Sequence, residues 1–248
     1  MYAAGLSDVG AVREQNEDAF FVRNEPIGPF PNLFVVADGM GGHKAGEVAS
    51  NLAVEKFCAF IKDFPASEFL RPGDYLDLLI GAAQYAGEEI IKKADEDESM
   101  LGMGTTLTAC VIADKKAFIA HIGDSRVYFV YNLGVTQITT DHTFVEELLQ
   151  TGRVTEDEIK THPRRHVLTR VLGVSDNMLV DGIVRDLGDA KAVLLCSDGL
   201  TNMLDNDAIV RIVNGLGYVE HRTKYLIDEA NKRGGLDNIS AIVVDVNR

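Results

Sequence analysis

The sequence has little basic charge and few cysteines. Its 248 residues include 24 lysines and arginines against 38 aspartates and glutamates, which gives a formal net charge of −14. Because a nucleic-acid backbone requires a basic protein surface, this balance argues against DNA or RNA as a partner. The three cysteines, Cys58, Cys110 and Cys196, form no close pair and have apolar settings. We therefore expect buried, reduced thiols in a reducing compartment.

Long hydrophobic runs are also missing. No stretch approaches the roughly 20 apolar residues that cross a bilayer. Met1–Leu6 has neither the basic start nor the apolar stretch of a signal peptide. These absences predict a soluble, cytoplasmic protein with no membrane insertion. No linker divides the chain, so we expect one domain over residues 1–248, with a monomer as the default.

The hydrophobic period changes along the chain. Apolar residues at helical spacing predict a helix from Ala45 and another over 74–94, with Asp74 as its N-cap. Strand-like runs come first at Tyr2–Asp8, Phe20–Arg23 and Leu33–Ala37, and then at Thr105–Ala113, Ala117–Ile122, Val127–Tyr131 and Val135–Thr139. The connections between the last four runs are too short for a crossover helix, so these strands should be antiparallel neighbours.

The second half of the chain continues the mixed pattern. Residues 140–175 return to helix, where Asp141 can cap Phe144–Gln150, Gly152 can end it, and Thr155–Glu158 fits a capping box. A strand, a helix and a strand then follow, at Ala192–Cys196, Thr223–Lys232 and Ile239–Val246. The sum predicts an α+β domain of antiparallel sheets with helices on their outer faces, and it excludes a doubly wound parallel sheet.

Three aspartates, Asp38, Asp198 and Asp237, lie where an apolar strand-like run meets a loop. A carboxylate at a buried strand end is costly unless it is satisfied, and three of them suggest a shared divalent cation. Oxygen ligands favour Mg²⁺ or Mn²⁺, and the sequence has no Cys/His spacing typical of zinc. Two such ions about 4 Å apart would make a hydroxide and hold a phosphoryl group. Arg13 is the candidate to bind that phosphate, although spacing alone favours an ordinary surface arginine.

Six motifs, taken in order, resemble the type 2C, metal-dependent protein serine/threonine phosphatases. They are Gly10–Asp18, Val36–His43, Gly104–Thr106, Gly123–Arg126, Ser197–Leu200 and Asp237–Ser240. The resemblance implies a central antiparallel β-sandwich flanked by helices on both faces. It also implies hydrolysis of phosphoserine and phosphothreonine in proteins by direct attack of a metal-bridging hydroxide. The chain resembles a bacterial stand-alone catalytic domain that opposes a membrane-bound serine/threonine kinase.

The same resemblance implies a set of metal ligands. Asp38 would bridge two Mn²⁺ or Mg²⁺ ions, with the carbonyl of Gly39 on one of them. Asp198 and Asp237 would hold the other ion. Asp124 would help to bind a third, weaker ion, as in many bacterial members.

Other implied roles surround these ligands. Glu17 and Asp18 would act mainly through metal-bound waters, and Arg13 would hold the phosphate. Residues 140–175 match the family's flap, a segment beside the active site. A basic cluster in the flap either recognises acidic phosphoprotein segments or makes internal ion pairs, the second being favoured for Arg170. Its members are His162, Arg164, Arg165, His166 and Arg170.

One position departs from part of the family. Some members have a histidine directly after the Asp–Gly pair, proposed as the general acid for the leaving alkoxide. Here Met40 stands at that position, and the nearest histidine is His43. Two roles stay open for His43, the general acid or a helix-start residue that bonds locally. In the second case a metal-bound water would protonate the leaving group.

Two other functions are compatible with parts of the pattern. A catalytically silent phosphoprotein-binding module would usually lose a metal aspartate, but Asp38, Asp198 and Asp237 are all present. A phosphohydrolase that forms an aspartyl-phosphate usually has an Asp-x-Asp pair and a parallel sheet. Neither the 38–40 segment nor the predicted antiparallel strands fit that class.

Overall fold

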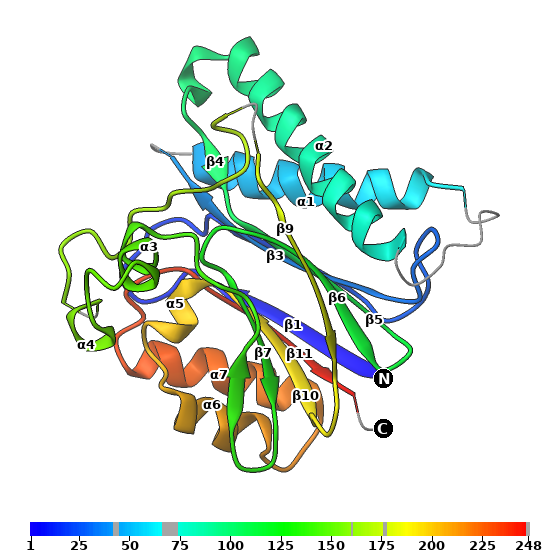
Figure 1. Ribbon diagram of the computed structural model, residues 1–248, viewed down its shortest axis with the longest axis vertical. Coiled ribbons are helices and arrows are strands. Elements are labelled where there is room, and N and C mark those ends of the chain that lie inside the picture. The colour runs from blue at the N-terminus through cyan, green and yellow to red at the C-terminus, as the bar shows by residue number, and fades with distance from the viewer. Residues whose placement is uncertain (42–44, 66–73, 160, 176–177, 247–248) are drawn as a thin grey trace.

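Two β-sheets pack face to face in the computed structural model, which describes residues 1–41, 45–65, 74–159, 161–175 and 178–246 (Figure 1). One sheet consists, in spatial order, of β1 (Tyr2–Asp8), β11 (Ile239–Asp245), β10 (Ala192–Cys196), β7 (Arg126–Val130) and β8 (Val135–Gln137). The other consists of β2 (Asp18–Arg23), β3 (Leu33–Met40), β5 (Leu107–Ala113), β6 (Lys116–Ile122) and β9 (Asp181–Asp186), with β4 (Gly104–Thr105) paired to β3. All of these pairings are antiparallel.

Helices cover the outer face of each sheet, as Figure 1 shows. The β2–β9 sheet is covered by α1 (Ala45–Asp63) and α2 (Asp74–Glu96), and the β1–β8 sheet by α5 (Asp198–Thr201), α6 (Asn206–Val213) and α7 (Val219–Lys232). One hydrophobic cluster lies under α1 and α2, a second between the sheets, and a third under α5, α6 and α7. The predicted α+β class, with a sandwich flanked by helices on both faces, is confirmed.

The remaining short helices lie at the edges of these layers. They are η1 (Glu98–Met100), α3 (Phe144–Gln150) and α4 (Glu156–Ile159). The helices α3 and α4 belong to the 140–175 segment, on the left of Figure 1.

The strand β3 shows how the sequence produces the sandwich. Leu33 and Val35 belong to the cluster under α1 and α2, whereas Phe34 and Val36 belong to the cluster between the sheets. Because successive side chains of a strand face opposite sides, a strand covered on both faces is an unbroken apolar run. Each such side chain, fully buried, stabilises the fold by roughly 2 kcal/mol.

One predicted pairing is wrong. The pairs β5–β6 and β7–β8 are antiparallel neighbours as expected, but β6 and β7 lie in different sheets. The loop 123–125 carries the chain from one sheet to the other. Gly123 has φ +108°, and a Cβ there would come within 2.5 Å of the Thr106 side chain. A short connection excludes a crossover helix, but it does not require its two strands to pair.

Two strands extend further than predicted near the aspartates. β2 begins already at Asp18, and β3 continues to Met40, where Gly39 and Met40 pair with β4. Asp18 therefore lies opposite Asp38 in the β2–β3 register. The pattern missed these ends because aspartate and glycine are depleted in strands and interrupt the apolar signal.

The helix starts of the 140–175 segment were predicted in part. Asp141 does not cap α3, because Thr143 is the N-cap and its hydroxyl accepts the N–H of Glu146 at 3.3 Å. Half of the predicted capping box is present, since the Glu158 carboxylate accepts the Thr155 N–H at 2.8 Å, whereas the Thr155 hydroxyl donates to that carboxylate at 2.9 Å and the Glu158 N–H donates to the Thr155 carbonyl. Arg170 makes the internal ion pair that was favoured for it, with Asp181 at 2.7 Å.

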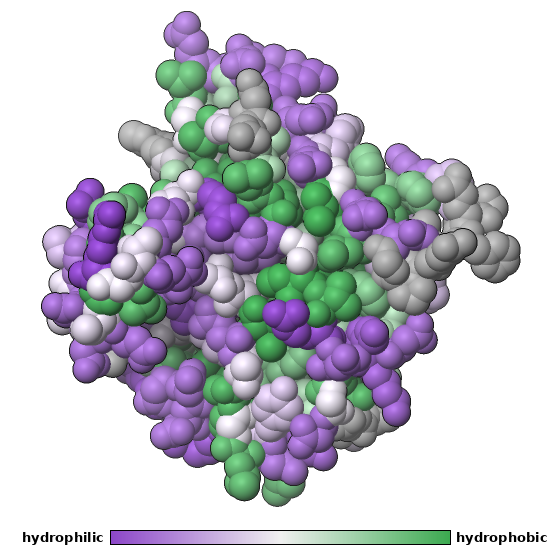
Figure 2. Space-filling view, in the orientation of Figure 1, coloured by the Kyte–Doolittle hydropathy of each residue, from purple (hydrophilic) through white to green (hydrophobic). Residues whose placement is uncertain are grey.

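The sequence analysis missed several elements and predicted one helix too short. The sequence pattern did not identify β9, α5 or α6, and α7 begins at Val219 rather than Thr223. The strand β9 is an edge strand with half-buried and exposed residues, so it lacks a strong apolar pattern. On the face of the molecule seen in Figure 2, hydrophilic residues cover most of the surface, and hydrophobic residues gather near its middle.

The cysteines are free, with Cys110 and Cys196 buried and Cys58 partly buried. Burial raises the pKa of Cys58 and that of Cys196 to about 12, so neither thiol is a ready nucleophile. Across the described ranges, no helix combines the length and the apolar character needed to cross a membrane.

Candidate metal centre

Asp18 and Asp38 face each other on neighbouring strands at one edge of the sandwich. The Oδ2 atom of Asp18 accepts a hydrogen bond from the Ser197 hydroxyl at 2.7 Å, and that hydroxyl accepts the N–H of Ser240 at 2.9 Å. The Oδ1 atom of Asp18 is buried and has no hydrogen-bond partner among the described residues. A buried carboxylate oxygen without a donor is costly, which makes this atom a candidate for a bound cation or its water.

Asp198 and Asp237 come from the other sheet. Asp198 opens α5 with one residue between it and the end of β10, and one residue also separates Asp237 from the start of β11. The two strands are antiparallel neighbours, so these loops meet at the same edge. Gly199 permits the approach, because a Cβ at that position would lie 2.0 Å from the carbonyl oxygen of Asn238.

Asn238 ties this loop to the 9–17 loop. Its side-chain amide donates to the carbonyl of Val9 at 2.9 Å and to that of Gln15 at 2.8 Å. Its side-chain oxygen accepts the N–H of Glu17 at 2.8 Å. Three hydrogen bonds from one side chain thus hold together segments that are more than two hundred residues apart in sequence.

Asp124 is buried in the 123–125 loop between the two sheets. The adjacent Ser125 hydroxyl hydrogen-bonds with the Thr106 hydroxyl at 2.8 Å. Thr106 also accepts the N–H of Asp38 at 2.9 Å and donates its own N–H to the Asp38 carbonyl at 2.9 Å. Thr106 therefore fixes the backbone of Asp38 relative to the loop that carries Asp124.

These five aspartates, called the carboxylate centre below, influence one another electrostatically. Burial raises the pKa of Asp38 well above its usual range, and the charges of Asp18 and Asp198 raise it further. Burial raises the pKa of Asp18 to about 7, and burial with the charge of Asp198 raises that of Asp124 to about 8. Burial and the charge of Asp237 raise the pKa of Asp198. Carboxylates held close without enough positive charge are a frequent sign of a functional site.

The donor set fits a hard divalent cation. All five side chains offer carboxylate oxygens, which Mg²⁺ and Mn²⁺ prefer. In the described part of the chain, no three His, Cys, Asp or Glu side chains already stand in metal-binding geometry. The fit therefore rests on the partnerless Oδ1 of Asp18 and on the mutual repulsion within the carboxylate centre.

Arg13 lies at the rim of the carboxylate centre. Its Nη2 donates to Oδ2 of Asp237 at 2.8 Å, while about half of the arginine side chain (52%) stays exposed. The 9–17 loop is anchored by the N–H of Ala11, which donates to the Gly235 carbonyl at 2.8 Å. This contact brings Arg13 to the predicted site, where spacing alone favoured an unconnected surface arginine.

Glu17 and Gly39 also lie at this edge. The N–H of Gly39 donates to the Glu17 carbonyl at 3.0 Å, and Gly39 is buried so closely that a Cβ would lie 2.1 Å from the Gly46 carbonyl. The Glu17 carboxylate lies against Gly46 at the start of α1. Burial raises the pKa of Glu17, while the charge of Arg13 opposes that shift.

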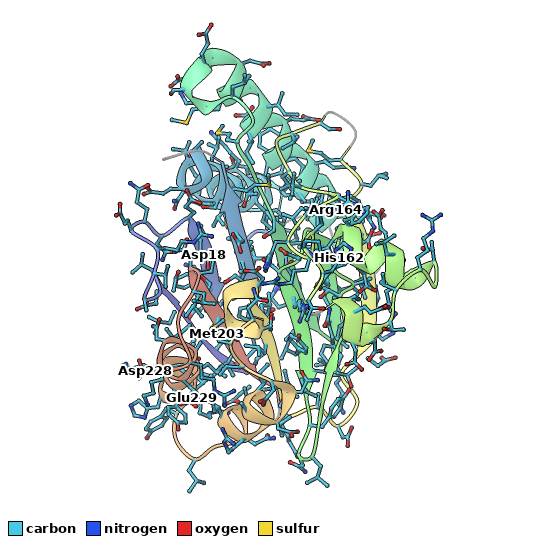
Figure 3. All side chains as sticks on the ribbon, turned by 90° about the vertical axis from the view of Figure 1, so that its left-hand side faces the viewer. Asp18, His162, Arg164, Met203, Asp228 and Glu229 are labelled. Carbon is cyan, nitrogen blue, oxygen red and sulfur yellow. The ribbon has the colours of Figure 1, made fainter. Side chains whose placement is uncertain are left out.

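The flap reaches the same centre through a histidine that sequence reasoning did not single out. Nδ1 of His166 lies 3.9 Å from Oδ2 of Asp198. Its membership of the basic cluster was the only signal in the sequence. In the view of Figure 3, the flap residues His162 and Arg164 lie on the right, and Asp228 and Glu229 of α7 lie at the lower left. Met40 is 37% exposed, and His43 lies outside the described residues.

Comparisons with known proteins agree on one family. A sequence profile described as "Protein phosphatase 2C" matches residues 11–227. The chain is 37% identical over 249 residues to the serine/threonine phosphatase stp of Listeria monocytogenes, with 99% of this chain and 96% of the relative covered. The latter alignment is long enough to include the segment that carries Asp237, which lies beyond the profile match.

Solved structures agree with the sequence matches. The serine/threonine phosphatase Stp1 from Staphylococcus aureus superimposes with a TM-score of 0.90 at 31% identity, covering 99% of this chain and 95% of that one. The catalytic domain of the serine/threonine protein phosphatase PstP, solved with two manganese ions, gives a TM-score of 0.80 at 32% identity, with 98% and 97% covered.

Proposed function

Because the chain belongs to the protein phosphatase 2C family, we propose that its carboxylate centre hydrolyses phosphoserine and phosphothreonine in proteins with Mn²⁺ or Mg²⁺. The observation that carries this proposal is the carboxylate centre itself. Five aspartates from both sheets meet at one edge, and burial together with neighbouring carboxylates raises the pKa values of Asp18, Asp38, Asp124 and Asp198. A divalent cation removes that repulsion and prepares the site to bind an anionic substrate.

Seven residues at this edge are proposed to hold the ions through oxygen atoms. They are Asp38, Gly39 through its carbonyl, Asp198, Asp237, Asp124, and, through water, Glu17 and Asp18. Asp38 would bridge two core ions, and Asp124 would serve a third. When bound, the ions supply a water of lowered pKa as the nucleophile and positive charge beside the phosphoryl oxygens.

Arg13 is proposed to orient the phosphate. A guanidinium can donate two parallel hydrogen bonds to phosphate oxygens, and Arg13 already reaches the rim of the carboxylate centre through Asp237. Its positive charge would stabilise the charge that develops on the phosphoryl group. No side chain is proposed to form a covalent phosphoenzyme.

The proton donor for the leaving alkoxide has two candidates, His43 and a metal-bound water. His43 remains a proposal, and its position lies outside the described residues. Met40, at the position where some relatives carry a histidine, has no proton to donate. Turnover near the wild-type rate in a His43→Ala variant would exclude the histidine as the acid.

The biological setting is proposed from the relatives. Phosphoproteins are the substrates of a protein serine/threonine phosphatase, and the relatives named above come from bacteria. We propose that the protein opposes a bacterial serine/threonine kinase, that it acts in the cytoplasm as a monomer, and that residues 1–248 form one catalytic domain with a flap at 140–175.

The test is hydrolysis of a phosphothreonine peptide with Mn²⁺, with chelator, and with the Asp38→Ala variant. We expect turnover with Mn²⁺ and none after full chelation or in the variant. Asp228→Ala is a matched control, because Asp228 lies on α7 and pairs with Lys224 at 2.6 Å, away from the site. Turnover that survives full chelation would contradict the proposal.

A further inference from the structure

The two ends of the flap meet in a small hydrogen-bonded structure, called the flap root below (residues 140–144 and 167–170). The N–H of Phe144 donates to the Val167 carbonyl at 2.8 Å, and the N–H of Thr169 donates to the His142 carbonyl at 2.8 Å. Thr143 and Leu168 form an antiparallel bridge between these two bonds. The flap therefore leaves and re-enters the domain at one place.

His142 connects this root to the loop of Asp124. Its backbone N–H donates to the Gly123 carbonyl at 2.7 Å, and its Nδ1 accepts the N–H of Gly123 at 3.1 Å. Both backbone polar groups of Gly123 are thus bound by one residue. Gly123 directly precedes Asp124, so the position of that carboxylate depends on His142.

The other nitrogen of the His142 ring binds Asp181. Because Nδ1 is an acceptor, the proton of the neutral ring is on Nε2, which donates to Oδ2 of Asp181 at 3.1 Å. Oδ1 of Asp181 accepts Nη1 of Arg170 at 2.7 Å. His142 is at the flap entry, Arg170 is at its exit, and Asp181 opens β9, so one carboxylate joins both ends of the flap to the sheet.

A second buried histidine holds His142 from the side. The rings of His121 and His142 lie 4.7 Å apart. Nε2 of His121 is 3.0 Å from the Thr140 carbonyl, and its Nδ1 is 2.9 Å from the Thr108 hydroxyl. Burial lowers the pKa of His121 to about 3 and also lowers that of His142, so both rings are neutral near pH 7. Every ring nitrogen in the pair has a partner.

We propose that His142 is a positioning residue that couples the flap to the carboxylate centre through two routes. One route is the Gly123 backbone, which sets the loop of Asp124. The other is the Asp181–Arg170 pair, which sets the flap and with it His166, 3.9 Å from Asp198. Loss of the Asp181 contact then weakens productive binding of a phosphoprotein more than that of a small phosphate ester, whereas loss of the Gly123 contact weakens binding of the ion that Asp124 would serve. The consequence for substrates rests on the proposed function.

Two substitutions at His142 separate its two contacts. In His142→Asn the amide oxygen takes the place of Nδ1 and can still accept the N–H of Gly123. The shorter side chain no longer reaches Asp181, so that hydrogen bond is lost. In His142→Gln the amide nitrogen can still donate to Asp181, while the acceptor for Gly123 is lost. Should these buried variants not fold, Arg170→Gln removes the outer contact at a side chain that is 35% exposed. Arg185→Gln is the matched control, since Arg185 lies on β9 and its guanidinium donates to the carbonyl of the adjacent Val184 at 3.0 Å.

The first measurement is independent of activity. Tryptic cleavage after Arg164 and Arg165, followed by mass spectrometry, reports how firmly the flap is held. We expect His142→Asn and Arg170→Gln to be cleaved about tenfold faster than wild type, because each loses a charge-assisted hydrogen bond. Arg185→Gln should match wild type. Wild-type cleavage rates in both His142→Asn and Arg170→Gln would overturn the proposal, even if the protein hydrolysed no phosphopeptide.

The second measurement compares two substrates and the Mn²⁺ isotherm. We expect His142→Asn and Arg170→Gln to raise KM for a phosphothreonine peptide about tenfold, with kcat and the KM for p-nitrophenyl phosphate nearly unchanged. His142→Gln should instead weaken binding of the third, weaker Mn²⁺ ion, which Asp124 would serve. Calorimetry measures this as a higher Kd for that ion. A loss of thermal stability alone, with both KM values and the isotherm unchanged, would show that His142 only supports the fold.

Discussion

Two buried polar regions adjoin at one edge of this sandwich, and they satisfy their charges in opposite ways. In the carboxylate centre acids face acids, and burial and mutual repulsion raise the pKa of Asp38. At the flap root and the adjoining start of β9, each acid has a basic partner: Asp141 binds Arg126, and Asp181 binds His142 and Arg170. Paired groups stabilise a fold, whereas unpaired buried charges raise its free energy until a ligand arrives. The contrast distinguishes the region proposed to bind cations from the one proposed to hold the flap.

The largest expected effect comes from removing one acid of the carboxylate centre. Asp38→Asn should lower turnover about a thousandfold or more, because it removes the proposed bridging ligand. In the presence of chelator the same variant should unfold at a higher temperature than wild type, because one buried negative charge is gone. Asp228→Asn is the control for both measurements. Wild-type turnover in Asp38→Asn would remove this residue from the proposed ligands.

Metal binding should change the pH dependence of stability. Asp18 and Asp124 have pKa values raised to about 7 and about 8, so the metal-free folded state holds protons that the unfolded state has lost. Stability should therefore fall as pH rises from about 4 to about 8. The lowered pKa of His121, about 3, acts only below about 6.5, where stability falls with falling pH.

The measurement is thermal unfolding at pH 6.5 and pH 8, with chelator and with Mn²⁺. We expect the metal-free protein to be less stable at pH 8, and Mn²⁺ at a hundredfold excess over Kd to add about 2.7 kcal/mol. The gain should be larger at pH 8, where more carboxylates are ionised. Equal stability at both pH values in chelator would mean that the carboxylates do not repel one another as described.

A paired acid should behave in the opposite way. The guanidinium of Arg126 donates to Asp141 through both Nε and Nη2, so Asp141→Asn leaves a partly buried cation without its counter-charge. We expect a loss of about 2 kcal/mol in the free energy of unfolding, measured in urea. Asp186→Asn is the control, because Asp186 is exposed and its ion pair with Lys116 is a long surface pair of 3.9 Å. A stabilised Asp141→Asn would erase the contrast between the two regions.

The smallest expected effect concerns the rim. Arg13→Lys keeps the charge but loses the planar pair of donors, so kcat/KM for a phosphopeptide should fall about tenfold. Arg23→Lys is the control, since Arg23 is half exposed and its ion pair, with Glu25 at 3.7 Å, lies at the surface. An unchanged kcat/KM would return Arg13 to the status of a surface residue.

Much of the fold was predictable because strand and helix periods are local properties. The apolar runs of β3 and β10 predicted strands, and α2 was predicted from its spacing and Asp74. The failures have the same origin. β9 is half exposed, and β6 and β7 are adjacent in sequence yet lie in different sheets, which no local period records.

The sequence alone determined the kinds of groups available and where each lies along the chain. Asp38, Asp198 and Asp237 follow or precede apolar strands, and their motifs in order indicated a metal-dependent phosphatase. Only the tertiary structure decided which groups meet. It placed Asp18 opposite Asp38, gave Thr106 both Asp38 and Ser125 as partners, and brought His142 to Gly123. Desolvation and charge repulsion depend on distance in space, and these distances are set by packing between layers whose residues are far apart in sequence.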